Sequence, residues 1–218
     1  MEVDLNGLSQ KFLLIGITLP GDYEEGPEVE ASLITRYLST GAIDIFHIRK
    51  PFSDENYVRK LLLHIPEDFH PRLTLHSHFH LIDEVKLGGL HLKEDSVPNP
   101  SKGLRLSRSR HSLSEFYNED NENLSYSFLS PVFDSISKRN YRSKFNLQDK
   151  SLRELLNKYP VMALGGINSV NLYQIFDAKF AGAALLGYLW SPEMNPSQII
   201  VKLIKAREEI LSNEKHII

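Results

Sequence analysis

The chain has 218 residues, which is enough for one domain or a small pair of domains with a sizeable hydrophobic core. Lys and Arg number 25 and Asp and Glu number 28, so the net charge of −3 gives no sign of nucleic-acid or anionic-membrane binding. The absence of cysteine excludes disulfides, thiolate catalysis and cysteine-ligated metal centres.

No segment is typical of a membrane span or of a secretory signal. The longest apolar stretch, residues 181–190, is about half as long as the ~20 residues that cross a bilayer. The N-terminus carries Glu2 and Asp4 and lacks a basic region followed by an apolar one. We therefore expect a cytoplasmic protein with no membrane and no nucleic acid among its partners.

Eight short apolar runs recur along the chain, and each is short enough to be a buried strand. They cover residues 12–18, 43–48, 72–76, 89–92, 103–107, 125–130, 160–164 and 181–186. Segments with helical spacing of apolar residues lie between most of them, at 28–39, 54–65, 152–156, 170–176 and 198–211. Ser53 or Asp54 before the second of these helices, and Ser169 before residues 170–176, are candidate N-caps.

This alternation predicts parallel strands joined by crossover helices. Eight such units predict a single, lean (β/α)8 TIM barrel that occupies the whole chain, 1–218, as one domain. Its ordered part would cover about residues 12–211, and residues 212–218 would form a frayed tail. An open doubly wound sheet of ~5–6 strands is the alternative, but eight strand candidates are hard to fit into it.

The active site of such a barrel lies at the C-terminal ends of its strands, so polar residues there are candidates. His47 and Arg49 end the second strand on one face, where both would be costly to bury without a ligand or partner. His76, His78 and His80 follow the third strand. On a strand they would suit a metal ion, but the next segment looks helical. A substrate-facing His76 or His78 and plain surface histidines are the alternatives.

A capping-box pattern, formed by Ser112 and Glu115, predicts that a helix begins just after the fifth strand. His111 directly precedes this pattern and would face the mouth of the barrel. An imidazole titrates near neutrality and therefore suits general acid–base catalysis. A purely structural histidine is the alternative.

Two further features suit a phosphate. A long loop follows the sixth strand at about residues 130–144, and its Ser135, Ser137 and Lys138 could hold phosphate oxygens. A solvated loop without a ligand is the alternative. The glycines Gly165, Gly166 and Gly187 follow the last two strands, where many barrels bind a phosphate through backbone N–H groups.

Five motifs together carry a family resemblance. They are H-I-R at 47–49, G-L-H-L at 89–92, S-R-H-S-x-x-E at 109–115, S-P-V-F-x-S-x-S-K at 130–138 and V-M-A-L-G-G-I at 161–167. In order and spacing they resemble the thiamine phosphate synthase and thiazole tautomerase (TenI-like) family, over about residues 12–190. The resemblance implies a small (β/α)8 barrel that holds thiazole phosphate on the Gly166 and Gly187 loops.

The resemblance leaves two reactions open. The family's synthases couple a hydroxymethylpyrimidine diphosphate to thiazole phosphate and release pyrophosphate with Mg²⁺. Its tautomerases aromatise a thiazole phosphate carboxylate by moving protons, without a metal. This chain departs from the synthase pattern, since His76, Ser77 and His78 stand where synthases have Asn-Asp-Arg. Lys50 and Pro51 likewise displace the lysine expected to grip the diphosphate.

These departures favour a tautomerase-like enzyme with no metal and no other cofactor. By the resemblance, His111 and His47 are the catalytic residues: His111 moves the protons and His47 orients the ring or the carboxylate. Arg49 would pair with the carboxylate, and His76 would also contact the substrate. A small-molecule phosphate is the expected partner, and a homodimer is a further expectation.

Three alternatives stay open. A synthase would use Mg²⁺ held by Asp95, or by its neighbour Glu94. A non-catalytic regulator would bind thiazole or thiamine phosphate without turnover. A metallohydrolase would use the histidines at successive strand ends, which are His47, His76, His91 and His111.

Overall fold

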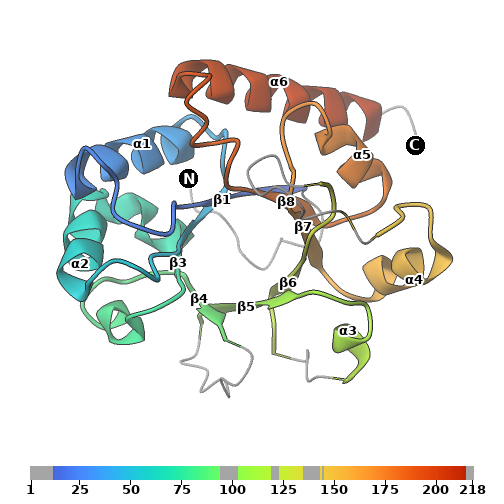
Figure 1. Cartoon of the computed structure of the whole chain (residues 1–218), viewed down its shortest axis with the longest axis horizontal. Coiled ribbons are helices and arrows are strands. Elements are labelled where there is room, and N and C mark those ends of the chain that lie inside the picture. Colours follow the sequence, from blue (N-terminus) through green and yellow to red (C-terminus); the bar gives the residue numbers. More distant parts are fainter. Residues whose placement is uncertain (1–11, 94–102, 119–122, 135–142, 144, 215–218) are drawn as a thin grey trace.

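The computed structural model describes residues 12–93, 103–118, 123–134, 143 and 145–214 (Figure 1). Several predicted site residues lie outside these ranges: Glu94, Asp95, Ser135, Ser137 and Lys138. The predictions made for them therefore stay predictions.

Eight parallel strands form a closed barrel in the order β1 to β8, with β1 pairing with both β2 and β8 (Figure 1). The strands are β1 (Leu13–Ile17), β2 (Ile45–Ile48), β3 (Leu73–Leu75), β4 (Gly89–Leu92), β5 (Arg105–Arg110), β6 (Tyr126–Leu129), β7 (Val161–Leu164) and β8 (Gly182–Leu185). The predicted (β/α)8 barrel is confirmed, and the doubly wound sheet is wrong.

Helices cover the outside of the barrel (Figure 1). They are α1 (Pro27–Ser39), α2 (Glu55–His64), α3 (Glu115–Asn118), α4 (Lys150–Lys158), α5 (Leu172–Asp177) and α6 (Pro196–Glu214). Short 3₁₀ turns, η2 (Glu67–Arg72) and η3 (Phe79–Ile82), flank β3. The helix expected after β3 is thus only η3, and α6 continues into the segment that was expected to fray.

β5 differs most from its prediction, since it covers Arg105–Arg110 rather than residues 103–107. The sequence of this strand, R-L-S-R-S-R, has few apolar residues. The apolar run that predicted the strand therefore ends before the strand does. The longer strand carries three inward-facing polar side chains: Ser107 and Ser109 contact His91, and Arg105 contacts Tyr126.

The barrel interior has an apolar part and a polar part. Apolar side chains from β1, β2, β6, β7 and β8 form an inner cluster: Leu13, Ile15, Ile17, Ile45, Tyr126, Phe128, Met162 and Ala184. On β2 to β5 the alternation of a strand brings polar groups inward instead, and His47, Thr74, His91 and Ser107 are all buried. Burial of so many polar groups on one side of a barrel indicates a functional constraint.

Candidate active site

A cavity of about 800 Å³ opens at the C-terminal ends of the strands. Its lining brings together six of the predicted site residues: Arg49, His76, His111, Gly165, Gly166 and Gly187. Two further residues, His91 and Arg108, also line it. The strand ends therefore meet as expected for a barrel active site.

His47 lies in the barrel interior and does not line this cavity. Its Nδ1 is 2.8 Å from His76 Nε2, and its Nε2 is 2.7 Å from the Tyr126 hydroxyl. Burial, with nearby His91 and Arg105, holds the pKa of His47 well below its usual value, so its imidazole is neutral. His47 was predicted to orient the ligand. Its ring instead contacts His76 and does not line the cavity that would hold a ligand.

His91 on β4 lines the cavity, although it was predicted only as one ligand of the metallohydrolase alternative. Its ring stacks on His76 at 4.1 Å between ring centroids, with 18° between the ring planes. Its Nδ1 is 2.9 Å from Ser107 Oγ and its Nε2 is 3.1 Å from Ser109 Oγ. Burial, with Arg49 and Arg108, lowers the pKa of His91 to about 3. The alternation of side chains along the strand G-L-H-L, which turns His91 inward, could have predicted this position.

His111 stands at the junction of β5 and α3, as predicted. Its backbone N–H donates to Glu115 Oε2 at 2.9 Å, and the Ser112 hydroxyl donates to Glu115 Oε1 at 2.8 Å. Burial of Glu115 works against ionisation, but these hydrogen bonds lower the pKa of its carboxyl group overall. The Glu115 carboxylate is thus anchored in place and fixes the backbone at His111.

The ring of His111 has a defined orientation. Its Nδ1 is 3.2 Å from the carbonyl oxygen of Ser130. A carbonyl oxygen only accepts hydrogen bonds, so Nδ1 must carry the proton of the neutral ring. The lone pair of His111 is then on Nε2, where it is available to a ligand in the cavity.

The loop after β7 needs its two glycines. Gly165 and Gly166 have φ angles of +101° and +64°, which side chains rarely adopt. A Cβ on Gly166 would also collide with the carbonyl oxygen of Asp134. Asn171 Nδ2 donates to the Gly166 carbonyl oxygen at 2.9 Å and holds the turn. The backbone therefore passes close to the cavity at the position predicted for phosphate.

The loops after β7 and β8 are joined by a hydrogen bond of 2.8 Å between Ser169 Oγ and the Tyr188 hydroxyl. The prediction that Ser169 caps the next helix is wrong, because α5 begins after Asn171. Asp54 does cap α2, since its side chain accepts a hydrogen bond from the backbone N–H of Tyr57 at 2.8 Å.

Lys50 is bound by groups of the protein, Glu30 and the Gly21 carbonyl. Its Nζ is 2.7 Å from Glu30 Oε1 and donates to the carbonyl oxygen of Gly21 at 2.6 Å, and both side chains of this ion pair are fully buried. Tyr57 donates a hydrogen bond of 2.9 Å to Glu30 Oε2. Although Lys50 borders the cavity, its charge serves the packing of α1 and α2 rather than a diphosphate.

The described lining of the cavity is poor in carboxylates. Glu115 is the one acidic residue in it, and its oxygens already accept hydrogen bonds from His111 and Ser112. Imidazoles and Ser77 occupy the end of β3. Mg²⁺ requires hard oxygen ligands in an octahedron, so this part of the site does not fit the Mg²⁺ of a synthase. Asp95, the residue predicted to hold that ion, lies outside the described residues.

Comparison with known proteins identifies the family. A family model described as thiamine monophosphate synthase (TMP-TENI) matches residues 15–189. The chain belongs to this family. The predicted resemblance is therefore confirmed.

Individual members of the thiamine monophosphate synthase family are similar to this chain at different levels. The thiamine-phosphate synthase of Latilactobacillus sakei subsp. sakei (strain 23K) is 25% identical over 138 residues, which cover 60% of this chain and 62% of that protein. The match thus spans less than two thirds of that relative. The crystal structure of thiamine phosphate pyrophosphorylase from Bacteroides thetaiotaomicron is 32% identical, with a TM-score of 0.70 over 92% of this chain and 98% of that one.

A further structure, thiamine phosphate pyrophosphorylase from Pyrococcus furiosus, is 21% identical with a TM-score of 0.73, over 94% of this chain and 100% of that one. This likeness shows the shared fold. The names of these relatives are those of synthases, so the expectation of a tautomerase gains no support from them. Among the described residues, no helix is long and apolar enough to span a membrane.

Proposed function

We propose that this member of the thiamine monophosphate synthase family binds a thiazole phosphate and moves protons on its ring, as a tautomerase of the thiazole phosphate carboxylate. The orientation of His111 is the observation that carries this proposal. Its Nδ1–H is directed to the Ser130 carbonyl oxygen, which leaves the basic Nε2 for the ligand. Proton transfer by a positioned imidazole contributes typically ~10²–10⁴-fold to a rate.

In this proposal, Nε2 of His111 removes a proton from the non-aromatic ring, and the resulting imidazolium returns a proton at a second ring position. One proton leaves and one is added, so the reaction isomerises the ring without a co-substrate. Arg49 lines the same cavity and supplies a cation for the carboxylate of the substrate.

The phosphate would lie against the loops after β7 and β8. Gly166 and Gly187 both line the cavity, and the hydrogen bond between Ser169 and Tyr188 holds the two loops together. Backbone N–H groups of glycine loops at these strand ends are a common phosphate site in barrels. We place this enzyme in the cytoplasm, with a small phosphate ester as its substrate.

The names of its relatives support a second candidate, the coupling of a hydroxymethylpyrimidine diphosphate to thiazole phosphate. This reaction would need Mg²⁺, with Asp95 as its expected ligand. The described lining argues against it, because Lys50 is paired with Glu30 and the end of β3 offers imidazoles.

Two assays on the purified chain separate the candidates. The first follows aromatisation of the thiazole phosphate carboxylate by ultraviolet absorbance and by proton exchange in ²H₂O. We expect turnover by the wild type and a loss of at least ~100-fold in kcat for His111→Asn. His64→Asn, on the exposed surface of α2, is the matched control and should keep full activity.

The second assay supplies both synthase substrates and Mg²⁺ and measures thiamine phosphate by mass spectrometry. Thiamine phosphate formation without any aromatisation would replace the tautomerase proposal with the synthase. Wild-type aromatisation by His111→Asn would remove His111 from the mechanism. Binding of thiazole phosphate with neither reaction would indicate a regulator.

A further inference from the structure

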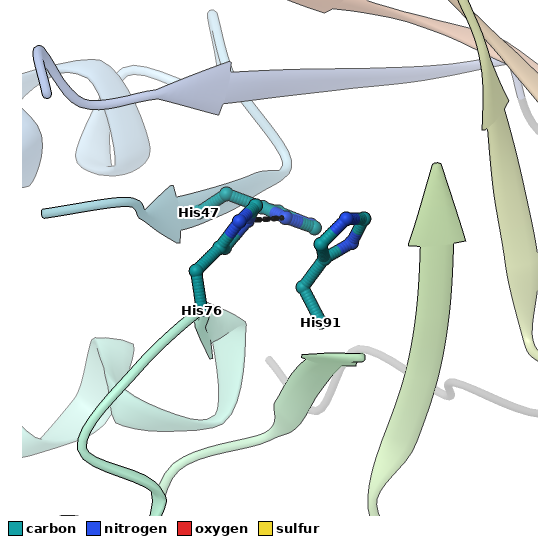
Figure 2. A group of neighbouring side chains, drawn as sticks. All are labelled: His47, His76 and His91. Carbon is teal, nitrogen blue, oxygen red and sulfur yellow. Dashed lines mark hydrogen bonds between the residues drawn. The ribbon is translucent and has the colours of Figure 1, made fainter. Parts of the chain in front are cut away.

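Three imidazoles from neighbouring strands meet at the floor of the cavity. His47 on β2, His76 after β3 and His91 on β4 each place a ring nitrogen within 4.8 Å of the other two (Figure 2). His76 and His91 line the cavity, whereas His47 is fully buried and does not line it. We propose that His47, His76 and His91 bind a divalent transition-metal ion of the Zn²⁺ class. This inference does not rest on the proposed reaction.

The spacing of the three rings suits such an ion. Zn–N bonds of about 2.0–2.1 Å in a tetrahedral site place ligand nitrogens about 3.3 Å apart. Here His47 Nδ1 and His76 Nε2 are 2.8 Å apart and share a hydrogen bond, and the cluster as a whole fits within 4.8 Å. Small side-chain rotations would lengthen the distance between His47 Nδ1 and His76 Nε2 and shorten the longer distances in the cluster, so that all three nitrogens could reach one ion.

Hydroxyl groups hold the outer nitrogens of two of these rings. His47 Nε2 is bonded to the Tyr126 hydroxyl at 2.7 Å, and His91 Nδ1 is bonded to Ser107 Oγ at 2.9 Å. When these hydroxyls accept, the outer nitrogens carry the protons and the inner nitrogens, His47 Nδ1 and His91 Nε2, carry lone pairs. In the structure these lone pairs face His76 Nε2 at 2.8 Å and Ser109 Oγ at 3.1 Å, and a metal ion would replace both contacts. Metal-binding histidines are usually oriented by an outer hydrogen bond of this kind.

The type of ligand also decides which ion fits. The ligands at this site are ring nitrogens of His47, His76 and His91. Three imidazoles favour Zn²⁺, Co²⁺, Ni²⁺ or Cu²⁺ over Mg²⁺.

A tetrahedral ion bound by the three histidines would have a fourth position, and the cavity that His76 and His91 line could supply its ligand. Arg49 and Arg108 line this cavity together with His91. Their positive charges oppose an isolated cation but favour an anionic group bound beside it. The fourth ligand would therefore be a carboxylate or phosphate oxygen of a substrate, or a hydroxide in its absence.

The test measures metal content on untagged protein that is equilibrated with ZnSO₄ and then desalted. We expect about one Zn²⁺ per chain by inductively coupled plasma mass spectrometry, and the visible bands of tetrahedral Co²⁺ after loading with CoCl₂. His76→Gln and His91→Gln should each lower Zn²⁺ affinity by more than ~100-fold. Tyr126→Phe, which removes the outer partner of His47 and leaves the three ligands in place, should lower it about 10–100-fold.

Two histidines outside the cluster give matched controls. His70 is buried and its Nε2 is 2.8 Å from the Ile65 carbonyl oxygen, while His80 is exposed and pairs with Glu55 at 3.0 Å. His70→Gln and His80→Gln should bind Zn²⁺ as the wild type does. The proposal is overturned if wild-type protein retains under ~0.1 Zn²⁺ per chain, or if folded His76→Gln and His91→Gln both bind normally. Because no substrate is present, loss of the tautomerase proposal would leave this result unchanged.

Discussion

The rings of His76 and His91 lie face to face at the floor of the cavity, with 4.1 Å between their centroids, although 15 positions separate the two residues in the sequence. The parallel pairing of β3 with β4 brings them together, and each ring is held in place by its own contact, His76 by His47 and His91 by Ser107. Two stacked imidazoles repel each other when both are protonated, and burial disfavours a positive charge on either ring.

The first prediction concerns the effect of pH on stability, because protonation of these buried rings is unfavourable. The folded-state pKa of each buried histidine in the cluster is lowered, to about 3 for His91, whereas an unfolded histidine titrates near ~6.5. Between about pH 3 and pH 6.5 the unfolded chain therefore binds more protons than the folded chain. The free energy of unfolding is thus retained above about pH 6.5 and falls as the pH is lowered toward 3. Urea unfolding between pH 7.5 and 4.5 should show this slope, at up to ~1.4 kcal/mol per pH unit for each histidine.

His91→Gln is the variant that tests the origin of the slope. It removes one titrating group, so the free energy of unfolding should depend less steeply on pH than in the wild type. His64→Gln, an exposed control, should leave the slope unchanged. An equal pH dependence in His91→Gln and the wild type would contradict the assignment.

A second prediction concerns the buried ion pair. Lys50→Met leaves the Glu30 carboxylate buried without its cation, and loss of one partner of a buried pair costs typically ~3–5 kcal/mol. Lys50→Met with Glu30→Gln should regain a large part of this free energy of unfolding, since no charge is then left unpaired. Urea titrations of the three proteins measure the difference. A loss below ~1 kcal/mol in the single variant would show that the pair does not support the fold.

A third prediction concerns the phosphate loop. Gly166→Ala forces a side chain into a positive φ and against the Asp134 carbonyl oxygen, so the loop must move away from the cavity. We expect inorganic phosphate and thiazole phosphate to bind at least ~10-fold more weakly by calorimetry, because displaced N–H groups lose charge-assisted hydrogen bonds of ~1.5–3 kcal/mol. Gly41→Ala is a matched control, since Gly41 also has a positive φ of +72° but no atom within 4 Å of the added Cβ. Equal phosphate affinity in both variants would place the phosphate elsewhere.

A fourth prediction concerns Arg49. Its side chain is exposed and borders the cavity, and Arg49→Gln removes a cation that we assign to the substrate carboxylate. KM should rise ~10-fold or more while kcat changes less, because the pairing forms in the ground state and persists in the transition state. Arg59→Gln removes a cation on α2 that pairs with Glu55 and Glu84, and its kinetics should match those of the wild type. A fall in kcat alone for Arg49→Gln would assign this residue to the chemical step.

The barrel and most of its cavity could be predicted from the sequence because apolar runs, glycine sites and the capping box are local signals. His111, Arg49 and Gly166 meet as expected since parallel strands end at one face. The true length of β5 could not be predicted, because its inward residues are polar and its pattern lacks apolar runs. The pairing of Lys50 with Glu30 joins the end of β2 to α1, and the cluster of His47, His76 and His91 joins three strands. Both depend on tertiary contacts that no local pattern contains.

The unequal halves of the barrel interior have a consequence for how this barrel tolerates substitution. Apolar side chains of β1, β6, β7 and β8 fill most of the inner cluster, whereas the polar groups are gathered on β2 to β5. Substitution on the polar strands alters which groups face a ligand and leaves most of that inner packing in place. In this chain, a few substitutions on adjacent strands would therefore change the groups offered to a ligand while the scaffold that closes the barrel keeps its packing.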